Sequence, residues 1–307
     1  MIANALGPIF LLILLGAFLR RSRFPGENFW PGVEKLTYFV LLPSLLIHRL
    51  AFADISNAPF GKIALAITVA LVLVSLGVFA VRRFTSANGP AFTSVFQGAV
   101  RFNSYVGLAI ANELYGEVGF VLGAVTVAIM IPLANLLCVM SFNVVSHEHH
   151  FRWKTFGLSI IQNPLIVACV LGIALNITGI GLPGWSGVTL GILSAAALPL
   201  GLLAVGVAID VSRIHGATKE IATSSAFRFF VVPVLMLMAC QWLGLPAASQ
   251  QILMLFACLP TASSSYILAR QLGGDTTLMA NIITVQTLVA FAAMPVWISI
   301  SEKFIAG

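Results

Sequence analysis

Long apolar runs fill most of the chain, and short charged or Pro- and Gly-rich breaks separate them. A membrane-spanning helix needs about 20 mostly apolar residues, and ten runs come close to that length or exceed it. Numbered as spans 1 to 10 in chain order, they cover residues 4–20, 34–53, 61–81, 91–114, 118–145, 157–177, 186–209, 219–242, 249–271 and 276–300. The pattern predicts an all-α integral membrane protein with ten transmembrane helices.

Spans 4 and 9 differ from the others because each is polar near its middle. Span 4 contains Asn103, Ser104 and Gly107, which favour local side-chain bonds or backbone freedom over a regular helix. Span 9 contains Pro260, which lacks an N–H group and clashes with the preceding turn. Irregular backbone at membrane depth persists only where protein buries it or where it lines a wet cavity. We therefore predict two broken helices whose breaks meet near the middle of the bilayer.

The two halves of the chain resemble each other weakly. A shift of 156 residues aligns Pro43 with Pro199, and a shift of 158 residues extends the match around the two polar spans. The repeats cover residues 1–146 and 155–307 with five spans each, and because five is odd, the second half enters the membrane from the opposite face. Inverted repeats are typical of secondary transporters, in which interrupted helices at matching positions mark the binding site.

A broken helix presents free N–H groups and the positive end of its dipole where its second half begins. Two inverted halves aim two such ends at one point, which favours a carboxylate-bearing solute over a cation. For each hydroxyl taken alone, packing between helices is the simpler interpretation, but the paired cluster favours a site. Candidate substrate-binding residues at the breaks are Asn103, Ser104, Tyr105, Pro260, Thr261, Ser263 and Ser264.

Arg101 is a charged residue inside span 4. It follows the predicted start of the span by ten positions, which corresponds to about 15 Å along a helix and places it near the centre of the bilayer. An ionised residue at that depth costs about 3 kcal/mol or more and marks a functional position by default. We expect Arg101 to bind the substrate; the alternative is that its side chain extends to the membrane surface.

Composition supports a membrane protein. Hydrophobic residues make up 59% of the 307 residues and charged residues 8%, against roughly 25% charged in soluble domains. A soluble globular protein and a disordered chain are therefore excluded.

The distribution of positive charge predicts the orientation. With ten spans, three basic residues lie on one face (Arg49, Lys62 and Lys303) and twelve on the other: Arg20, Arg21, Arg23, Lys35, Arg82, Arg83, Arg152, Lys154, Arg213, Lys219, Arg228 and Arg270. Basic residues favour the cytoplasmic side. We predict a multi-pass protein of the cell (inner) membrane with the 146–155 connection in the cytoplasm and both termini outside.

Several other chemistries find no support. The four cysteines lie singly in apolar runs without metal-ligand spacing, and the His147–His150 cluster is interpreted as a solvated loop. No phosphate-binding loop and no embedded catalytic pair occurs in the sequence, so we expect no ATP-driven transport, no enzymatic activity and no cofactor. Because the positive charge is spread along the membrane edges, we also expect no nucleic acid as a partner. No carboxylate lies in mid-span, and the coupling ion, H⁺ or Na⁺, is left open, as is a homodimer.

Short motifs in order along the chain carry a family resemblance. They are Leu41-Leu42-Pro43, Arg101 to Leu108, Asn163-Pro164 and Pro260-Thr261-Ala262. Together they resemble the auxin efflux carrier family, in particular its bacterial members, whose fold is similar to that of the sodium/bile-acid symporters.

The resemblance implies a function. It implies a secondary carrier of organic anions with a scaffold of spans 1, 2, 6 and 7, a transport domain of spans 3–5 and 8–10, and an elevator-like motion. By position, Asn103 and Ser44 match substrate-contacting residues, and Pro260 matches the proline of the crossing helices. The long loop of the plant carriers is reduced here to residues 146–155, so small metabolites are expected in place of auxin. The alternative is a membrane receptor that binds such a solute without moving it.

Overall fold

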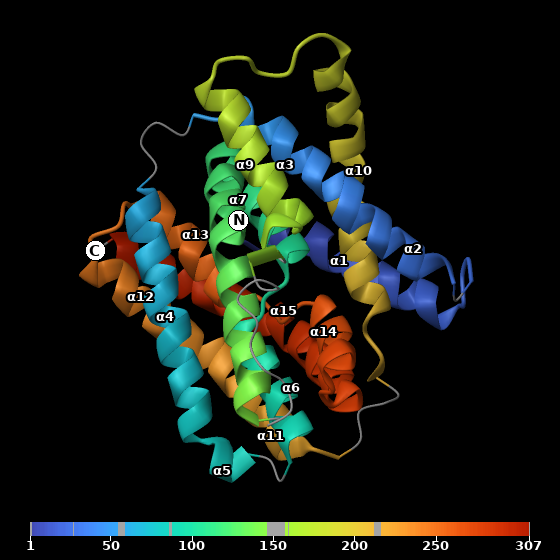
Figure 1. Ribbon diagram of the computed structural model, residues 1–307, viewed down its shortest axis with the longest axis vertical. Helices are drawn as coiled ribbons and strands as arrows, with labels where there is room; N and C mark the ends of the chain where they lie inside the picture. The colour runs from blue at the N-terminus through green and yellow to red at the C-terminus, as the bar shows by residue number, and fades with distance from the viewer. Residues whose placement is uncertain are drawn as a thin grey trace. The chain divides into compact units, whose positions relative to one another are not determined.

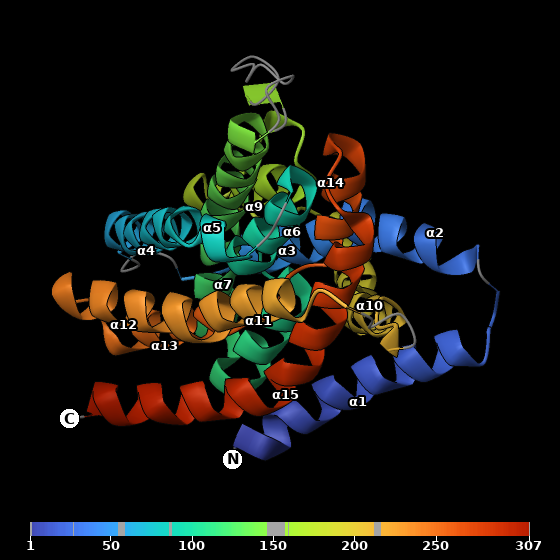
Figure 2. The ribbon, with the colours of Figure 1, turned by 90° about the horizontal axis from the view of Figure 1, so that it is seen from below.

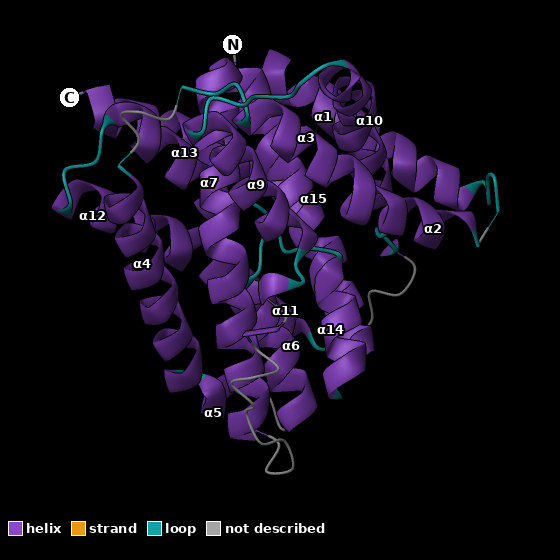
Figure 3. Cartoon of the chain, turned by 45° about the horizontal axis from the view of Figure 1, so that its top comes forward, coloured by secondary structure: helices purple, strands orange, loops and turns teal. Residues whose placement is uncertain are grey.

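The computed structural model describes residues 2–26, 28–54, 59–85, 88–145, 157–158, 160–211 and 216–306. Within these ranges the regular structure is helical and no strand occurs (Figure 3). The helices are α1 (Ile2–Arg21), α2 (Phe29–Leu36), η1 (Thr37–Leu41), α3 (Leu42–Leu50), α4 (Phe60–Ala80), α5 (Arg82–Thr85), α6 (Gly89–Val100), α7 (Ser104–Val145), α9 (Pro164–Ile177), α10 (Trp185–Val207), α11 (Thr218–Ala226), η3 (Phe227–Val231), α12 (Val232–Trp242), α13 (Ala247–Ala257), α14 (Ser264–Leu272) and α15 (Thr276–Ala306). The predicted all-α class is confirmed.

The chain folds into two compact units that each combine separate segments. Unit 1 consists of Met1–Ala58, Leu108–Ala128 and Trp153–Val207, and unit 2 consists of Pro59–Gly107, Ile129–Arg152 and Ala208–Gly307. The boundary falls twice within α7, at residues 107–108 and 128–129. Neither unit corresponds to one half of the sequence.

In unit 1, α10 packs against α1 and α3, and α3 packs against α9 (Figure 1). Small residues permit the close contact of α1 with α10. A Cβ atom on Gly16 would overlap the carbonyl group of Leu203, and one on Gly206 would overlap the carbonyl oxygen of Ile13. Glycines at such crossings let two backbones approach closely in a membrane, where packing rather than the hydrophobic effect holds helices together.

In unit 2, α6 packs against α4, α11 and α15, while α12 packs against α4 and α13 (Figure 2). The segments α11, η3 and α12 form one continuous rod whose middle turn is a π-helix. Val232 N–H bonds to the carbonyl of Phe227, five residues earlier, immediately before Pro233. The same arrangement precedes Pro43 in unit 1. A π-turn widens the helix where a proline ring would collide with the carbonyl four residues before it.

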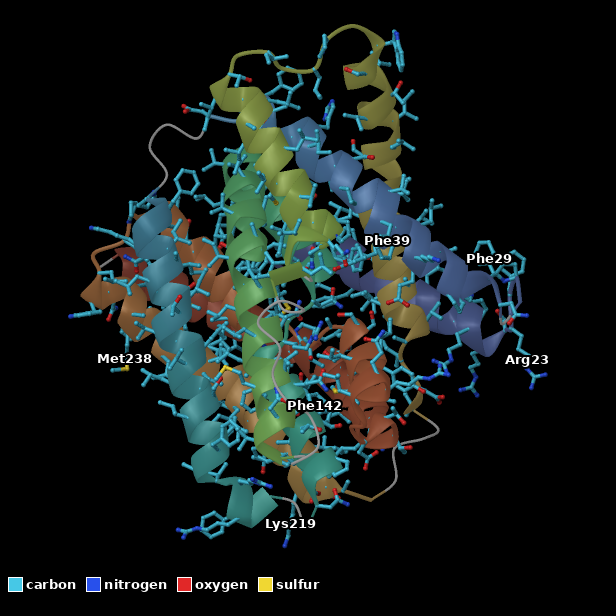
Figure 4. The ribbon with its side chains drawn as sticks, in the orientation of Figure 1. Arg23, Phe29, Phe39, Phe142, Lys219 and Met238 are labelled. Carbon is cyan, nitrogen blue, oxygen red and sulfur yellow. The ribbon has the colours of Figure 1, made fainter. Side chains whose placement is uncertain are left out.

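Six segments are long and apolar enough to cross a membrane by length and composition, among the residues described. They are Asn4–Arg21, Phe60–Ala80, Gly89–Val145, Trp185–Val207, Thr218–Trp242 and Thr276–Ile305, and shorter apolar helices cover Pro164–Ile177 and Ala247–Ala257. Large apolar side chains on the surface, such as Phe29, Phe39 and Met238, extend away from the ribbon (Figure 4). Such surfaces suit lipid contact, since few soluble monomers expose so much apolar area.

Both polar spans are broken where the sequence predicts. Helix ends at Val100 and resumes at Ser104, and it ends again at Ala257 and resumes at Ser264. A further kink separates spans 4 and 5 at Gly116, whose φ of 61° suits glycine. Two segments named above lie outside the described residues. They are the 146–155 connection, with its histidine cluster, and residues 212–215, which include Arg213.

Candidate substrate-binding site

The two helix breaks meet within unit 2. The first covers residues 101–103 and the second residues 258–263. The backbone N–H of Asn103 donates to the carbonyl oxygen of Pro260 at 2.9 Å, so the middle of one break bonds directly to the middle of the other. The prediction that the discontinuities near Asn103 and Pro260 adjoin is confirmed. We call this junction the crossing.

Local chemistry explains why the helices restart where they do. The Oδ1 atom of Asn103 accepts a hydrogen bond from Val106 N–H at 3.2 Å, which caps the beginning of α7 in the manner preferred by Asn. At the second break Pro260 offers no N–H, and the N–H of Thr261 donates to Oε1 of Gln286 on α15 at 3.1 Å. The backbone groups nearest the crossing are thus satisfied by the protein.

The crossing is electropositive on one side. Helix α14 begins at Ser264, where the helix dipole places partial positive charge. The N–H groups of Ser265 and Tyr266 already donate to the carbonyl oxygens of Ala262 and Ser263. The Nη2 atom of Arg101 donates to the Oγ atom of Ser264 at 3.1 Å, so a full positive charge adjoins that helix end. Helix N-termini of this kind bind carboxylates and other anions.

The predicted site residues differ in their access to the surface. Arg101, Ser104, Ser263 and Ser264 are partly exposed. The buried set is Asn103, Tyr105, Pro260 and Thr261, and within it the Oγ1 atom of Thr261 shares a hydrogen bond of 3.3 Å with Ser265 Oγ. The four partly exposed residues can reach a solute, whereas the four buried residues fix the shape of the crossing.

Ser44 belongs to unit 1 and is buried. Its hydroxyl donates to the carbonyl oxygen of Val40 at 2.7 Å, one turn earlier in the same helix. This back-bonding is common for Ser within a membrane helix, and it occupies the only proton that the Ser44 hydroxyl has to donate.

Gln286 connects the two broken helices. Its side chain is fully buried. Besides accepting from Thr261 N–H, it donates through Nε2 to Gly98 O and to Ser224 Oγ, both at 3.1 Å. Gly98 O lies near the end of α6, so one amide side chain bonds to the polar backbone of both spans. The sequence shows that Gln286 is a polar residue within span 10, but it does not reveal the partners of its side chain, because these belong to other helices.

Arg228 corrects the predicted distribution of charge. The sequence places it among the twelve basic residues of one membrane face, but the structure buries it completely in unit 2, within η3. Its guanidinium donates to Leu259 O at 2.5 Å and to Phe256 O at 2.7 Å. The signal that could have revealed it is its depth, since it follows the start of span 8 by nine positions. By contrast, Lys219 at the beginning of α11 extends outward (Figure 4).

The described residues offer little to a metal ion. No group of three or more His, Cys, Asp or Glu side chains gathers among them. Every Asp and Glu that they include is at least partly exposed. The crossing is therefore lined by arginine, hydroxyls and backbone groups, which can recognise an anion by hydrogen bonding and charge.

Comparison with known proteins covers nearly the whole chain. Residues 1–298 match a family described as membrane transport protein. The chain is 22% identical over 294 residues to an uncharacterized transporter of Methanothermobacter thermautotrophicus, covering 94% of this chain and 95% of that protein. It is also 22% identical over 305 residues to the uncharacterized transporter YfdV of Escherichia coli (strain K12), covering 96% of each.

Proposed function

The chain belongs to the membrane transport protein family, and from that premise we propose that it is a secondary carrier of small organic anions. It is the family to which the resemblance to auxin efflux carriers points. The family and the apolar helices together indicate a multi-pass membrane protein. The proposal adds a carboxylate substrate, the residues that bind it and the motion that carries it across the membrane.

The observation that carries the proposal is the Arg101–Ser264 contact at the crossing. The guanidinium brings a permanent positive charge to the beginning of α14. Ser104 lies at the beginning of α7 and Ser263 at the beginning of α14, and both residues are partly exposed. A carboxylate matches this set, because it accepts hydrogen bonds from a guanidinium and further bonds from hydroxyl donors. A cationic substrate would meet repulsion from Arg101.

The division into two compact units supports an elevator-like motion. Unit 1 contains predicted spans 1, 2, 6 and nearly all of 7, which the resemblance assigns to the scaffold, and unit 2 contains spans 3, 8, 9 and 10 together with both breaks. Residues 108–128 group with unit 1, although the resemblance would place them in the transport domain. A substrate bound at the crossing would travel with unit 2.

The remaining parts of the proposal are the membrane topology and location. We propose ten spans in two inverted repeats, 1–146 and 155–307, with both termini outside the cell (inner) membrane. A positive-φ glycine follows the second half of each broken helix, at Gly116 and Gly273, which agrees with a repeated unit. Cysteine accessibility at either terminus in intact cells tests the orientation.

A flux experiment tests the proposed function. Purified protein would first be screened with organic acids by thermal shift, and the strongest stabiliser would then be followed, radiolabelled, into proteoliposomes. We expect saturable flux in the wild type and its loss in Asn103→Ala, because that substitution removes the cap that fixes the beginning of α7 beside the crossing. Flux would also be measured in Ser44→Ala, because Ser44 is the other position that the resemblance assigns to the substrate and it lies in unit 1.

The outcomes separate the alternatives. Binding without flux would identify a receptor in place of a carrier. Full flux in a correctly inserted Asn103→Ala variant would reject the role of the crossing.

A further inference from the structure

Arg228 places a buried positive charge at the end of a half-helix. Its side chain is inaccessible to solvent. Nε donates to the carbonyl oxygen of Leu259 and Nη2 to that of Phe256. Both acceptors belong to the C-terminal end of α13 or to the break that follows it, where the helix dipole is negative.

The break itself frees these carbonyl oxygens. In an unbroken helix, Phe256 O would accept a hydrogen bond from the N–H of residue 260, but residue 260 is a proline and has none. Leu259 lies within the break, outside any helix. At the other break the corresponding donor is neutral, because the amide of Gln286 bonds to Gly98 O. The two breaks are thus satisfied differently, one by an amide and the other by a cation.

Freed carbonyls at such breaks are the groups that hold a coupling Na⁺ in transporters with discontinuous helices. Here a guanidinium already occupies two of them. A sodium ion at the same oxygens would lie close to the charge of Arg228, and no buried Asp or Glu among the described residues offsets that repulsion.

We propose that Arg228 takes the place of a coupling metal cation in unit 2, so that anion binding at the crossing requires no sodium ion. The part that concerns anion binding rests on the proposed function. The part that concerns the occupied carbonyls rests on the contacts of Arg228 alone. Arg228 is a positioning residue in this scheme: it fixes the end of α13 and supplies a constant positive charge behind the crossing.

Thermal unfolding of the detergent-purified full chain tests the occupied carbonyls without any substrate. Midpoints would be measured in NaCl, KCl and choline chloride at equal ionic strength. A sodium ion bound to the folded state raises the midpoint by about 5 °C when its concentration is about 100-fold above the dissociation constant. We expect the wild type to unfold at the same temperature in all three salts.

Substitution of Arg228 should expose the carbonyls again. We expect Arg228→Ala to unfold at a lower temperature and to regain part of the loss in low-millimolar guanidinium, which restores the missing cation. The same concentration of urea, which has a similar shape but no charge, should restore nothing. Arg228→Lys should remain insensitive to the choice of salt, and the exposed Lys219→Ala, on the same rod, should behave like the wild type.

Two results of the unfolding measurements would overturn the proposal. One is a specific rise of the wild-type midpoint in sodium. The other is a folded Arg228→Ala variant that urea and guanidinium affect equally. If that variant does not fold, the salt comparison on wild type and on Arg228→Lys still decides.

Flux into proteoliposomes separates this proposal from the proposed function. Anion flux in the wild type that is unchanged when choline replaces sodium supports both. Flux that requires sodium would reject the role of Arg228 and leave the carrier intact. Absence of flux for every anion tested would count against the carrier, while the unfolding measurements would still report on Arg228.

Discussion

Replacing Gln286 with leucine should destabilise unit 2 more than replacing a buried residue whose hydrogen bond stays within its own helix. The side chain is fully buried and makes three hydrogen bonds, to Thr261 N–H, Gly98 O and Ser224 Oγ. Leucine has a similar volume and introduces no charge. The substitution therefore removes the polar connection between the two broken helices and leaves the packing largely in place.

Two estimates bracket the cost. Hydrogen bonds between membrane helices average about 0.6 kcal/mol, so the loss of three bonds gives about 2 kcal/mol. A buried donor or acceptor left without a partner costs about 1–3 kcal/mol. Thr261 N–H and Gly98 O both lie in buried residues, so the two orphaned groups give about 2–6 kcal/mol. The second estimate should apply, because neither group can turn toward water.

The assay is thermal unfolding of the detergent-purified protein, where about 2 °C per kcal/mol predicts a midpoint lowered by about 4–12 °C. Thr287→Val is the matched control. Thr287 is the next residue, is equally buried, and donates only to Ile283 O within its own helix. It should lower the midpoint by less than about 2 °C, since that carbonyl keeps its backbone bond. Equal midpoints for the two variants would refute the bridging role of Gln286.

Two further predictions concern the site and unit 1. Arg101→Gln should weaken binding of an organic acid at least tenfold in a thermal-shift titration, and Arg101→Lys much less, because lysine retains the charge beside Ser264; equal losses would assign Arg101 a packing role. Gly206→Ala should destabilise the protein by about 1–3 kcal/mol through overpacking, since the new methyl group would overlap Ile13 O. Gly7→Ala has open space, so its unfolding midpoint should stay the same or rise, and a fall as large as that of Gly206→Ala would contradict the packing explanation.

The positions of both breaks could be predicted because they depend on local chemistry. Pro260 lacks a backbone donor in any fold, and Asn103 caps the helix that follows it by a bond to Val106, three residues away. Each signal lies within one turn of the break that it causes. The order of apolar runs likewise predicts helices, because a chain with so few polar residues satisfies its backbone in lipid only by internal hydrogen bonds.

The surroundings of the breaks could not be predicted from local pattern. Arg228 closely follows the polar helix α11, and Gln286 lies within α15 between Thr284 and Thr287. Nothing in either segment indicates which other helices these two side chains contact. The charge of Arg228 predicts a position at the membrane surface. The partners that its side chain has in the buried position, Phe256 and Leu259, lie about thirty positions further along the chain, so no nearby residue indicates them.

The amino-acid sequence therefore fixes where the helices run and where they break, since both follow from groups that a residue has or lacks. Which side chains satisfy the freed carbonyls, and how distant segments combine into two units, becomes visible only when the helices are packed together. A missing hydrogen bond is a local property of the chain, whereas its replacement must come from a donor that packing brings within about 3 Å. That packing depends on every helix of the unit at once.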